Sequence, residues 1–200
     1  MKQRIFILIL LSGVFFSSCQ KSSVKPETTT PVTQTTPTSP TVGNPVVGSV
    51  TPDSLSNING YLRLQFAKDS INTDNILVNF NPSAKTKYLP NEDAPTFQGF
   101  GQISLSSFSS DNVPLAINAL PLTKKGISIG LKVNAQTDGV YQLKLVTIKS
   151  IPATFDVLVI DKYKKDSLDV RHNPGLLFNI IKADTASFGS NRFKLVVRLR

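Results

Sequence analysis

Apolar and polar residues alternate with a period of two from Gly60 onward, and this pattern constrains the fold more than any other feature of the chain. In residues 61–66, Leu62, Leu64 and Phe66 alternate with polar residues. Successive side chains of a β-strand point to opposite faces of a sheet, so this spacing places the apolar residues on one buried face. The pattern therefore predicts a strand whose other face meets solvent.

The same pattern recurs along the rest of the chain, in the segments 76–80, 126–133, 141–148, 155–163, 176–182 and 193–200. Turn-forming residues separate these segments, at 123–126, 136–139, 172–175 and 188–191. No stretch has the apolar spacing of an amphipathic helix. We therefore expect an all-β domain, and specifically an antiparallel β-sandwich, Ig-like or jelly-roll-like, of about 8 to 10 strands.

The last predicted strand has the clearest division between two faces. Its apolar residues would point into the core, namely Phe193, Leu195, Val197 and Leu199. Its cationic residues would line the outer face, interrupted by Val196, namely Arg192, Lys194, Arg198 and Arg200. Such a row is more often a solvated face that discourages edge-to-edge pairing. The alternative is a binding stripe for an anionic glycan.

The first 18 residues have the order of an export signal. Lys2 and Arg4 precede an apolar run over residues 5–16, and two small residues follow the run. A run of about a dozen apolar residues is too short to span a bilayer as a helix, which takes ~20 residues. We therefore expect residues 1–18 to be a signal peptide.

Cys19, the only cysteine of the chain, directly follows this segment. Residues 16–19 resemble the lipobox of bacterial lipoproteins, with Phe16 in a place where lipoproteins of Bacteroidota also carry aromatic residues. The resemblance implies lipidation of Cys19 and an anchor in the outer membrane, at either the cell surface or the periplasmic face. The alternative is an ordinary signal peptide followed by an incidental cysteine.

Residues 19–57 have the composition of a linker. They are rich in Thr, Pro, Ser and Val and contain no aromatic residue, so they cannot bury enough apolar surface to offset the entropy lost on ordering. Proline favours extended chain, and about 30 residues at ~3.1 Å each could reach ~90 Å. We expect a disordered stalk over 19–57 and the β-sandwich domain over 58–200.

Most of the predicted domain also resembles a β-sandwich module of secreted and surface proteins of Bacteroidota, which often precedes a type IX secretion sorting domain. The resemblance rests on residues 73–94, 114–121 and 139–148 and on the order of Asp161, Leu168, Phe178 and Arg192-Phe193 in the tail. It implies an architecture and a structural or adhesive role rather than a chemical activity.

Four Asp-Ser or Asp-Thr pairs, each followed by an aliphatic residue or Ala, resemble the O-glycosylation motif of the same bacteria. The acceptor hydroxyls would be those of Ser54, Ser70, Ser167 and Thr185. A bulky glycan is accommodated most easily in surface turns, where we expect these residues to lie.

The chain is basic, with 22 Lys and Arg against 13 Asp and Glu and a formal net charge of +9. Removal of residues 1–18 takes away Lys2 and Arg4 and leaves 9 − 2 = +7. A positive surface could favour an anionic polysaccharide or another envelope protein as a partner in addition to the membrane. We expect no nucleic-acid partner for an exported and tethered protein.

One string looks enzymatic, since residues 126–130 match G-x-S-x-G with Ser128 at the centre. Asp156 or Asp161 followed by His172 would complete the residue order of α/β-hydrolases. That motif works only where a strand turns sharply into a helix, whereas another alternating strand is predicted here. We therefore expect Ser128 to be an outward-facing strand residue and the chain to have no catalytic residues.

We also expect no metal or cofactor site. His172 is the only histidine, so the chain lacks the usual ligand set for zinc. Acidic clusters at 72–75 and 91–93 offer oxygen ligands but follow no known calcium-loop spacing.

These observations predict a non-enzymatic, membrane-anchored lipoprotein with a structural or adhesive β-sandwich module at the cell envelope. The alternative is a glycan-binding accessory lipoprotein of a polysaccharide-uptake system, although the chain has no Trp and only four Tyr to offer as stacking platforms. A third possibility is a small hydrolase that uses Ser128.

Overall fold

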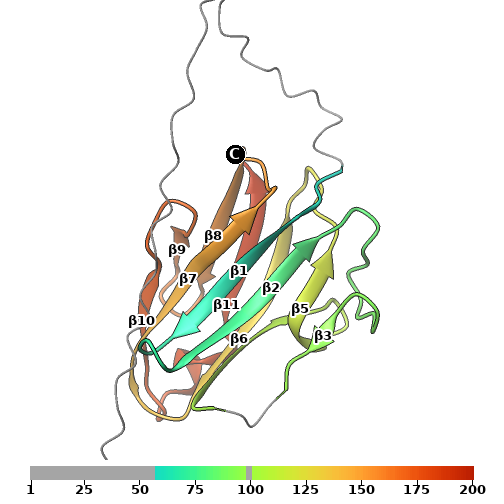
Figure 1. Ribbon diagram of the computed structural model, residues 1–200. Coiled ribbons are helices and arrows are strands. Elements are labelled where there is room, and N and C mark those ends of the chain that lie inside the picture. The colour runs from blue at the N-terminus through green and yellow to red at the C-terminus, as the bar shows by residue number, and fades with distance from the viewer. Residues whose placement is uncertain (1–56, 98–100) are drawn as a thin grey trace, which may run out of the picture. The chain divides into compact units, whose positions relative to one another are not determined.

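A computed structural model describes residues 57–97 and 101–200, and the described part is an all-β domain, as predicted (Figure 1). Its only helical element is a single 3-10 turn, η2 (Thr185–Ser187). Within these ranges no helix is long and apolar enough to cross a membrane. The predictions for the signal peptide, for Cys19, for the linker up to residue 56 and for Ser54 lie outside the described residues.

Eleven strands make up the domain. In chain order they are β1 (Gly60–Ala67), β2 (Thr73–Phe80), β3 (Ala94–Pro95), β4 (Ile103–Phe108), β5 (Pro114–Leu120), β6 (Ile127–Ala135), β7 (Gly139–Lys149), β8 (Phe155–Asp161), β9 (Asp166–Asp169), β10 (Leu176–Ile180) and β11 (Gly189–Leu199).

The strands form one mixed sheet in the order β10-β7-β1-β2-β5-β4-β6-β11-β8-β9, with β3 paired to β5 (Figure 1). The expected antiparallel pairing is wrong at one place, because β2 and β5 are parallel, with Leu77 opposite Ile117. The expected two-sheet sandwich is not confirmed, because the sheet continues through β4 and β5 and curls until it is nearly closed into a barrel. Alternation indicates which face of a strand is buried, but not which strand is its neighbour.

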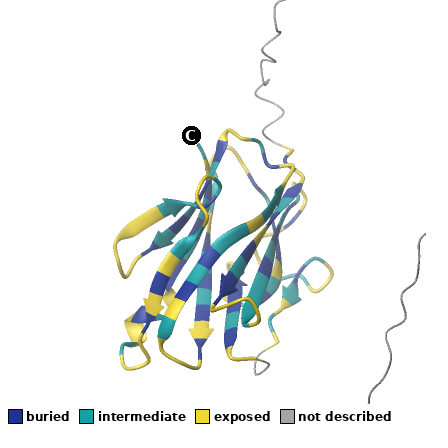
Figure 2. Cartoon of the chain, turned by 60° about the vertical axis from the view of Figure 1, so that its left-hand side comes forward, coloured by how far each residue is buried: buried dark blue, intermediate teal, exposed yellow. Residues whose placement is uncertain are grey.

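The core lies inside the curled sheet, and buried residues alternate with more exposed ones along the strands (Figure 2). Phe66, Tyr141 and Phe178 form a ring cluster on β1, β7 and β10, with the centroids of Phe66 and Tyr141 5.3 Å apart. Phe178 also meets Phe193 of β11 edge to face, at 4.7 Å between centroids. Aromatic packing therefore joins strands from distant positions in the sheet order.

All the segments that alternate in the sequence are strands, and β3, β4, β5 and β9 are additional. The alternation of apolar and polar residues does not reveal β4, because Ser106 and Ser107 are both buried. The polar residues of this strand therefore do not mark a solvent-facing side. The side-chain amide of Asn118 on β5, also buried, donates to Ser107 Oγ at 3.3 Å. Buried serine and asparagine that satisfy each other look like loop residues in a sequence.

The predicted turn at 188–191 is wrong, because β11 already begins at Gly189. The register of β11 against β6 shifts between Gly189 and Phe193, which indicates a bulge. Such an irregularity interrupts the alternation of a strand, and Arg192 and Phe193 are consecutive buried residues. The predicted turn at 123–126 is confirmed, because the N–H of Gly126 donates to the carbonyl oxygen of Thr123. Gly126 has a positive φ of +74°, which glycine adopts easily.

The first strand begins and the last strand ends at the same end of the domain (Figure 1). Tyr61 of β1 pairs with Lys149 of β7, and Leu199 of β11 pairs with Phe155 of β8, so the short turn from β7 to β8 lies at this end. The opposite end carries the connections at 68–72, 136–138, 162–165 and 181–188.

Candidate functional site

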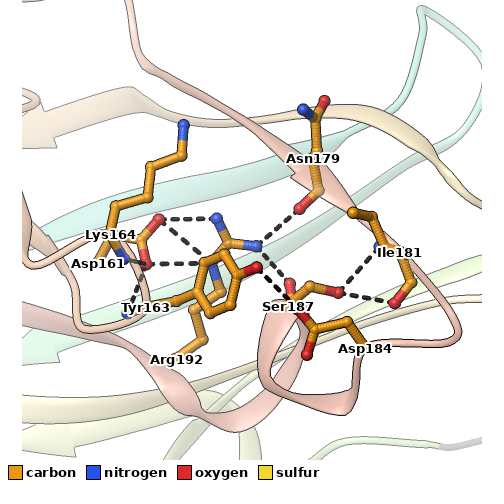
Figure 3. Close-up of polar contacts among 8 residues, drawn as sticks. All are labelled: Asp161, Tyr163, Lys164, Asn179, Ile181, Asp184, Ser187 and Arg192. Carbon is orange, nitrogen blue, oxygen red and sulfur yellow. Dashed lines mark hydrogen bonds and ion pairs between the residues drawn. The ribbon is translucent and has the colours of Figure 1, made fainter.

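Arg192 and Asp161 form a buried ion pair at the end of β8 (Figure 3). Arg192 Nη2 lies 2.8 Å from Asp161 Oδ2, and the two side chains are 0% and 1% exposed. The carboxylate also accepts hydrogen bonds from the backbone N–H groups of Tyr163 (3.0 Å) and Lys164 (3.2 Å). Asp161 therefore holds the β8–β9 turn as well as the guanidinium.

The same guanidinium reaches across to the other end of the sheet. Its Nη1 donates to the carbonyl oxygens of Asn179 on β10, at 2.7 Å, and of Ser187. Strand β10 is one edge of the sheet, and β8 is next to the other edge. Arg192 therefore links the two ends of the sheet where no backbone ladder does, and the predicted place for Arg192 on the outer face is wrong.

Three aromatic rings surround the guanidinium. Its central carbon lies 4.7 Å from the centroids of Phe178 and Phe193 and 4.9 Å from that of Tyr163. A desolvated cation over aromatic faces is stabilised by the ring quadrupoles. We call Asp161, Tyr163, Phe178, Arg192 and Phe193 the closure cluster.

The segment between β10 and β11 is fastened beside the closure cluster. The Tyr163 hydroxyl donates to Asp184 Oδ2 at 2.7 Å, and this hydrogen bond, together with the charge of Asp184, raises the pKa of Tyr163. Asp184 also accepts the N–H of Ala186 and so begins η2. Ser187 Oγ bonds both the N–H and the carbonyl of Ile181 at 2.9 Å.

A first shallow hollow of about 600 Å³ lies on the outer face of β6 and β11. Ser128 and Gly130 of β6 line it together with Lys194 of β11, which pairs with Gly130. Gly130 leaves room for a ring on this face, since a Cβ there would lie 3.4 Å from Cδ2 of Phe108. A second hollow of about 600 Å³ adjoins the first, because Lys162, Ser190 and Asn191 line both. The second hollow extends to Tyr163 and Thr185. We call the two together the β6–β11 groove.

Lys162 and Lys194 are the two cations of the first hollow. The ion pairs among residues 57–97 and 101–200 are His172–Asp169, Arg192–Asp161 and Arg200–Asp156, so neither lysine is neutralised by a described carboxylate. The predicted outer row of cations is wrong for Arg192, which is buried, whereas Lys194 lines the groove and Arg198 and Arg200 are exposed, with Arg200 Nε 2.5 Å from Asp156 Oδ1.

Ser128 is exposed near the beginning of β6, as predicted. The strand continues through Gly130 to Ala135, so the sharp turn that makes a G-x-S-x-G serine reactive does not occur here. His172 lies in the exposed connection between β9 and β10, with its Nδ1 2.7 Å from Asp169 Oδ2, and it does not line the groove that contains Ser128.

The pKa of Asp169 lies below its ordinary value of 3.8. Burial alone would raise this pKa, but the hydrogen bonds from His172 and from the backbone N–H of Arg171, together with the charges of His172 and Arg200, outweigh it. A carboxylate with a lowered folded-state pKa stabilises the fold above its unfolded-state pKa, and this contribution is lost as the pH falls through the folded-state value.

We therefore expect Asp169→Asn to be less stable than the wild type near pH 7 and the difference to shrink below about pH 4. Urea unfolding at neutral and acidic pH measures this difference. A gap that stayed constant across the acidic range would show that ionisation of Asp169 does not contribute to stability.

The acidic clusters considered for calcium bind backbone N–H groups instead. Asp74 Oδ2 accepts from Leu105 N at 2.7 Å, and Asp93 accepts from Leu89 N and Ala119 N at 2.7 and 2.8 Å. In the described part of the chain, no three His, Cys, Asp or Glu side chains form a group that could hold a metal ion.

Three of the predicted glycan acceptors lie within the described residues, and all three are exposed: Ser70, Ser167 and Thr185. Ser70 lies in the β1–β2 turn, Ser167 is next to the β8–β9 turn and Thr185 begins η2. They share the end of the domain opposite Gly60, where the first strand begins. Their modification stays a prediction.

Comparison of the chain with models of protein families, with curated proteins and with solved structures gives no match. The sequence did not identify the closure cluster or the groove as sites. The one local signal was Gly130, a glycine inside a strand, which often marks a place of close approach.

Proposed function

We propose that the protein is a non-enzymatic outer-membrane lipoprotein whose β-domain is a structural or adhesive module at the cell envelope. The lipid anchor would be at Cys19, after removal of residues 1–18, and residues 19–57 would form the stalk. The observation that carries the adhesive role is the β6–β11 groove, because it offers hydroxyl, amide and ammonium groups on an open sheet face. Such groups hold a polar ligand by hydrogen bonds and charge.

The arrangement of the domain supports a tethered module. Gly60 and the carboxyl end of β11 lie at one end, whereas Lys162, Tyr163 and Thr185 at the far end of the groove lie at the other (Figure 1). A stalk that enters beside Gly60 would leave the opposite end free for contacts. The sandwich expected from the sequence would correspond to the two halves of the curled sheet, which meet through Phe178 and Phe193.

Replacement of Cys19 by alanine tests the anchor. We expect a clickable fatty acid fed to the cells to label the wild type and not Cys19→Ala, because only a cysteine sulfur can take the diacylglycerol thioether. Cys19→Ala should also move from the membrane fraction to the soluble fraction. Equal labelling of both proteins, or of neither, would refute the lipoprotein proposal. Protease treatment of intact cells then separates a surface location from a periplasmic one.

A second candidate function is that of a glycan-binding accessory lipoprotein in a polysaccharide-uptake system. The observation that favours it is again the β6–β11 groove, in which Phe108 supplies an aromatic ring beside hydroxyl and amide groups. Both candidate functions use the same groove, and they differ in what the cell does with the bound ligand.

A further inference from the structure

We propose that the β6–β11 groove binds an acidic glycan, with Lys162 and Lys194 pairing with carboxylate or other anionic groups along the sugar chain. This inference rests on the proposed adhesive role of the domain, and it adds the location of the binding site and the charge of its ligand.

The charge of the groove is positive. Lys162 lines it from the β8–β9 turn and Lys194 from β11, and its described lining contains no aspartate or glutamate. Arg192 also lines the second hollow, but its guanidinium is paired with the buried carboxylate of Asp161. A concave surface with charge of one sign concentrates ligands of the opposite sign, so the free charge of the groove favours an anionic ligand.

The groove also has neutral polar groups in addition to its two lysines. The outer face offers the hydroxyls of Ser128 and Ser190 and the side-chain amide of Asn191. Such groups can donate to and accept from sugar hydroxyls. The ring of Phe108 lies beside the backbone of Gly130, where the apolar face of a sugar ring could pack against it. A sugar chain presents hydroxyls, an apolar ring face and, in acidic glycans, carboxylates at regular intervals.

The shape of the groove favours a linear chain over a compact ligand. It is open along its length, and it continues from Phe108 past Lys194 to Lys162, Tyr163 and Thr185. Single-stranded nucleic acid would instead be expected to use several aromatic side chains as stacking platforms. The rings of the groove are divided between its two hollows, Phe108 in one and Tyr163 and Phe188 in the other. They offer no continuous row on which successive bases could stack, so an acidic glycan satisfies the groups of the groove better.

The test uses the full-length protein in detergent and an oligogalacturonate of defined length. We expect saturable binding that weakens as salt rises from about 0.05 to about 0.5 M, because salt screens exposed charges. The same oligosaccharide with its carboxylates methyl-esterified should bind at least about tenfold more weakly. The double variant Lys162→Gln/Lys194→Gln should lose a similar factor, whereas Lys124→Gln/Lys125→Gln, which removes two exposed charges from a turn outside the groove, should bind like the wild type.

A second variant separates the shape of the groove from its charge. Gly130→Gln adds a neutral side chain to the outer face, where the nearest atoms to a new Cβ belong to the Phe108 side chain. We expect the variant to have the same midpoint of urea unfolding as the wild type and to bind oligogalacturonate at least about tenfold more weakly.

Four outcomes would overturn the inference. They are absence of any oligogalacturonate binding, equal binding of the esterified oligosaccharide, equal loss in the Lys124/Lys125 variant, and tighter binding of a single-stranded oligonucleotide of matched charge. The adhesive role would survive each of these results if the purified protein still bound whole envelope material, and it would fail separately if that binding were also absent.

Discussion

Replacing Arg192 by methionine should lower the free energy of unfolding by about 3–5 kcal/mol, the usual cost of removing one partner of a buried ion pair. The variant would leave the Asp161 carboxylate buried without its cation, and the carbonyl oxygens of Asn179 and Ser187 without their donor. Methionine keeps much of the side-chain length, so the loss would report on the charge and the hydrogen bonds more than on volume. Urea unfolding of the full chain measures this difference.

Arg198→Met is the matched control on the same strand, because Arg198 is exposed on the outer face and forms no ion pair among the described residues. We expect this control to change the free energy of unfolding by no more than ~0.5 kcal/mol. The double variant Arg192→Met/Asp161→Asn should be less destabilised than the sum of its two single variants, because the asparagine leaves no buried charge unpaired. Equal losses for Arg192→Met and Arg198→Met would contradict the assignment of Arg192 as the link between the sheet ends.

Replacing Phe178 by alanine should also lower the free energy of unfolding by about 3–5 kcal/mol. Phe178 is 2% exposed on the edge strand β10, and its ring packs against Phe66, Phe193 and the guanidinium of Arg192. The truncated side chain would leave a cavity between β10 and β11, where no backbone ladder holds the sheet together. The loss should appear in urea unfolding as a lower midpoint.

Leu177→Ala provides the control for this prediction, since Leu177 is the neighbouring residue of the same edge strand and is 60% exposed. Its effect should stay within ~0.5 kcal/mol. The losses of Phe178→Ala and Arg192→Met should not be additive, because the two side chains are in contact in one cluster. Additive losses would mean that the ring and the guanidinium stabilise the closure independently.

The closure cluster and the groove are connected through β11. Arg192 points into the core, and Lys194, two residues later, lines the groove on the outer face. The bulge between Gly189 and Phe193 also carries Ser190 and Asn191 to both hollows. The irregular start of one strand therefore supplies both the link between the sheet ends and part of the proposed binding surface.

The strand pattern could be predicted because it depends on neighbours in the sequence. Leu62, Leu64 and Phe66 are fully buried, as their alternation indicates, and so are Phe193, Leu195 and Val197. The outward position of Ser128 followed from the same rule. Burial of one face of a strand is a property of local spacing, so a single sequence is enough to reveal it.

The site could not be predicted in the same way, because its residues come from segments far apart in the chain. Phe108, Gly130, Lys162 and Lys194 lie on three strands and a turn that become neighbours only through the order of the sheet. Arg192 looked like a solvent-facing cation, since alternation with Phe193 assigns it to the outer face. The bulge reverses that assignment, and a bulge depends on how the partner strands pair.

By itself, the sequence determined that the domain is all-β, which residues of most strands face the core, and that G-x-S-x-G lies on a strand rather than on an elbow. Only the tertiary structure decided that the sheet is single and nearly closed, that β2 and β5 run parallel, and that Arg192 is buried against Asp161. The physical reason is that burial alternates with local spacing, whereas strand order and the burial of a charge depend on partners that arrive from distant parts of the chain.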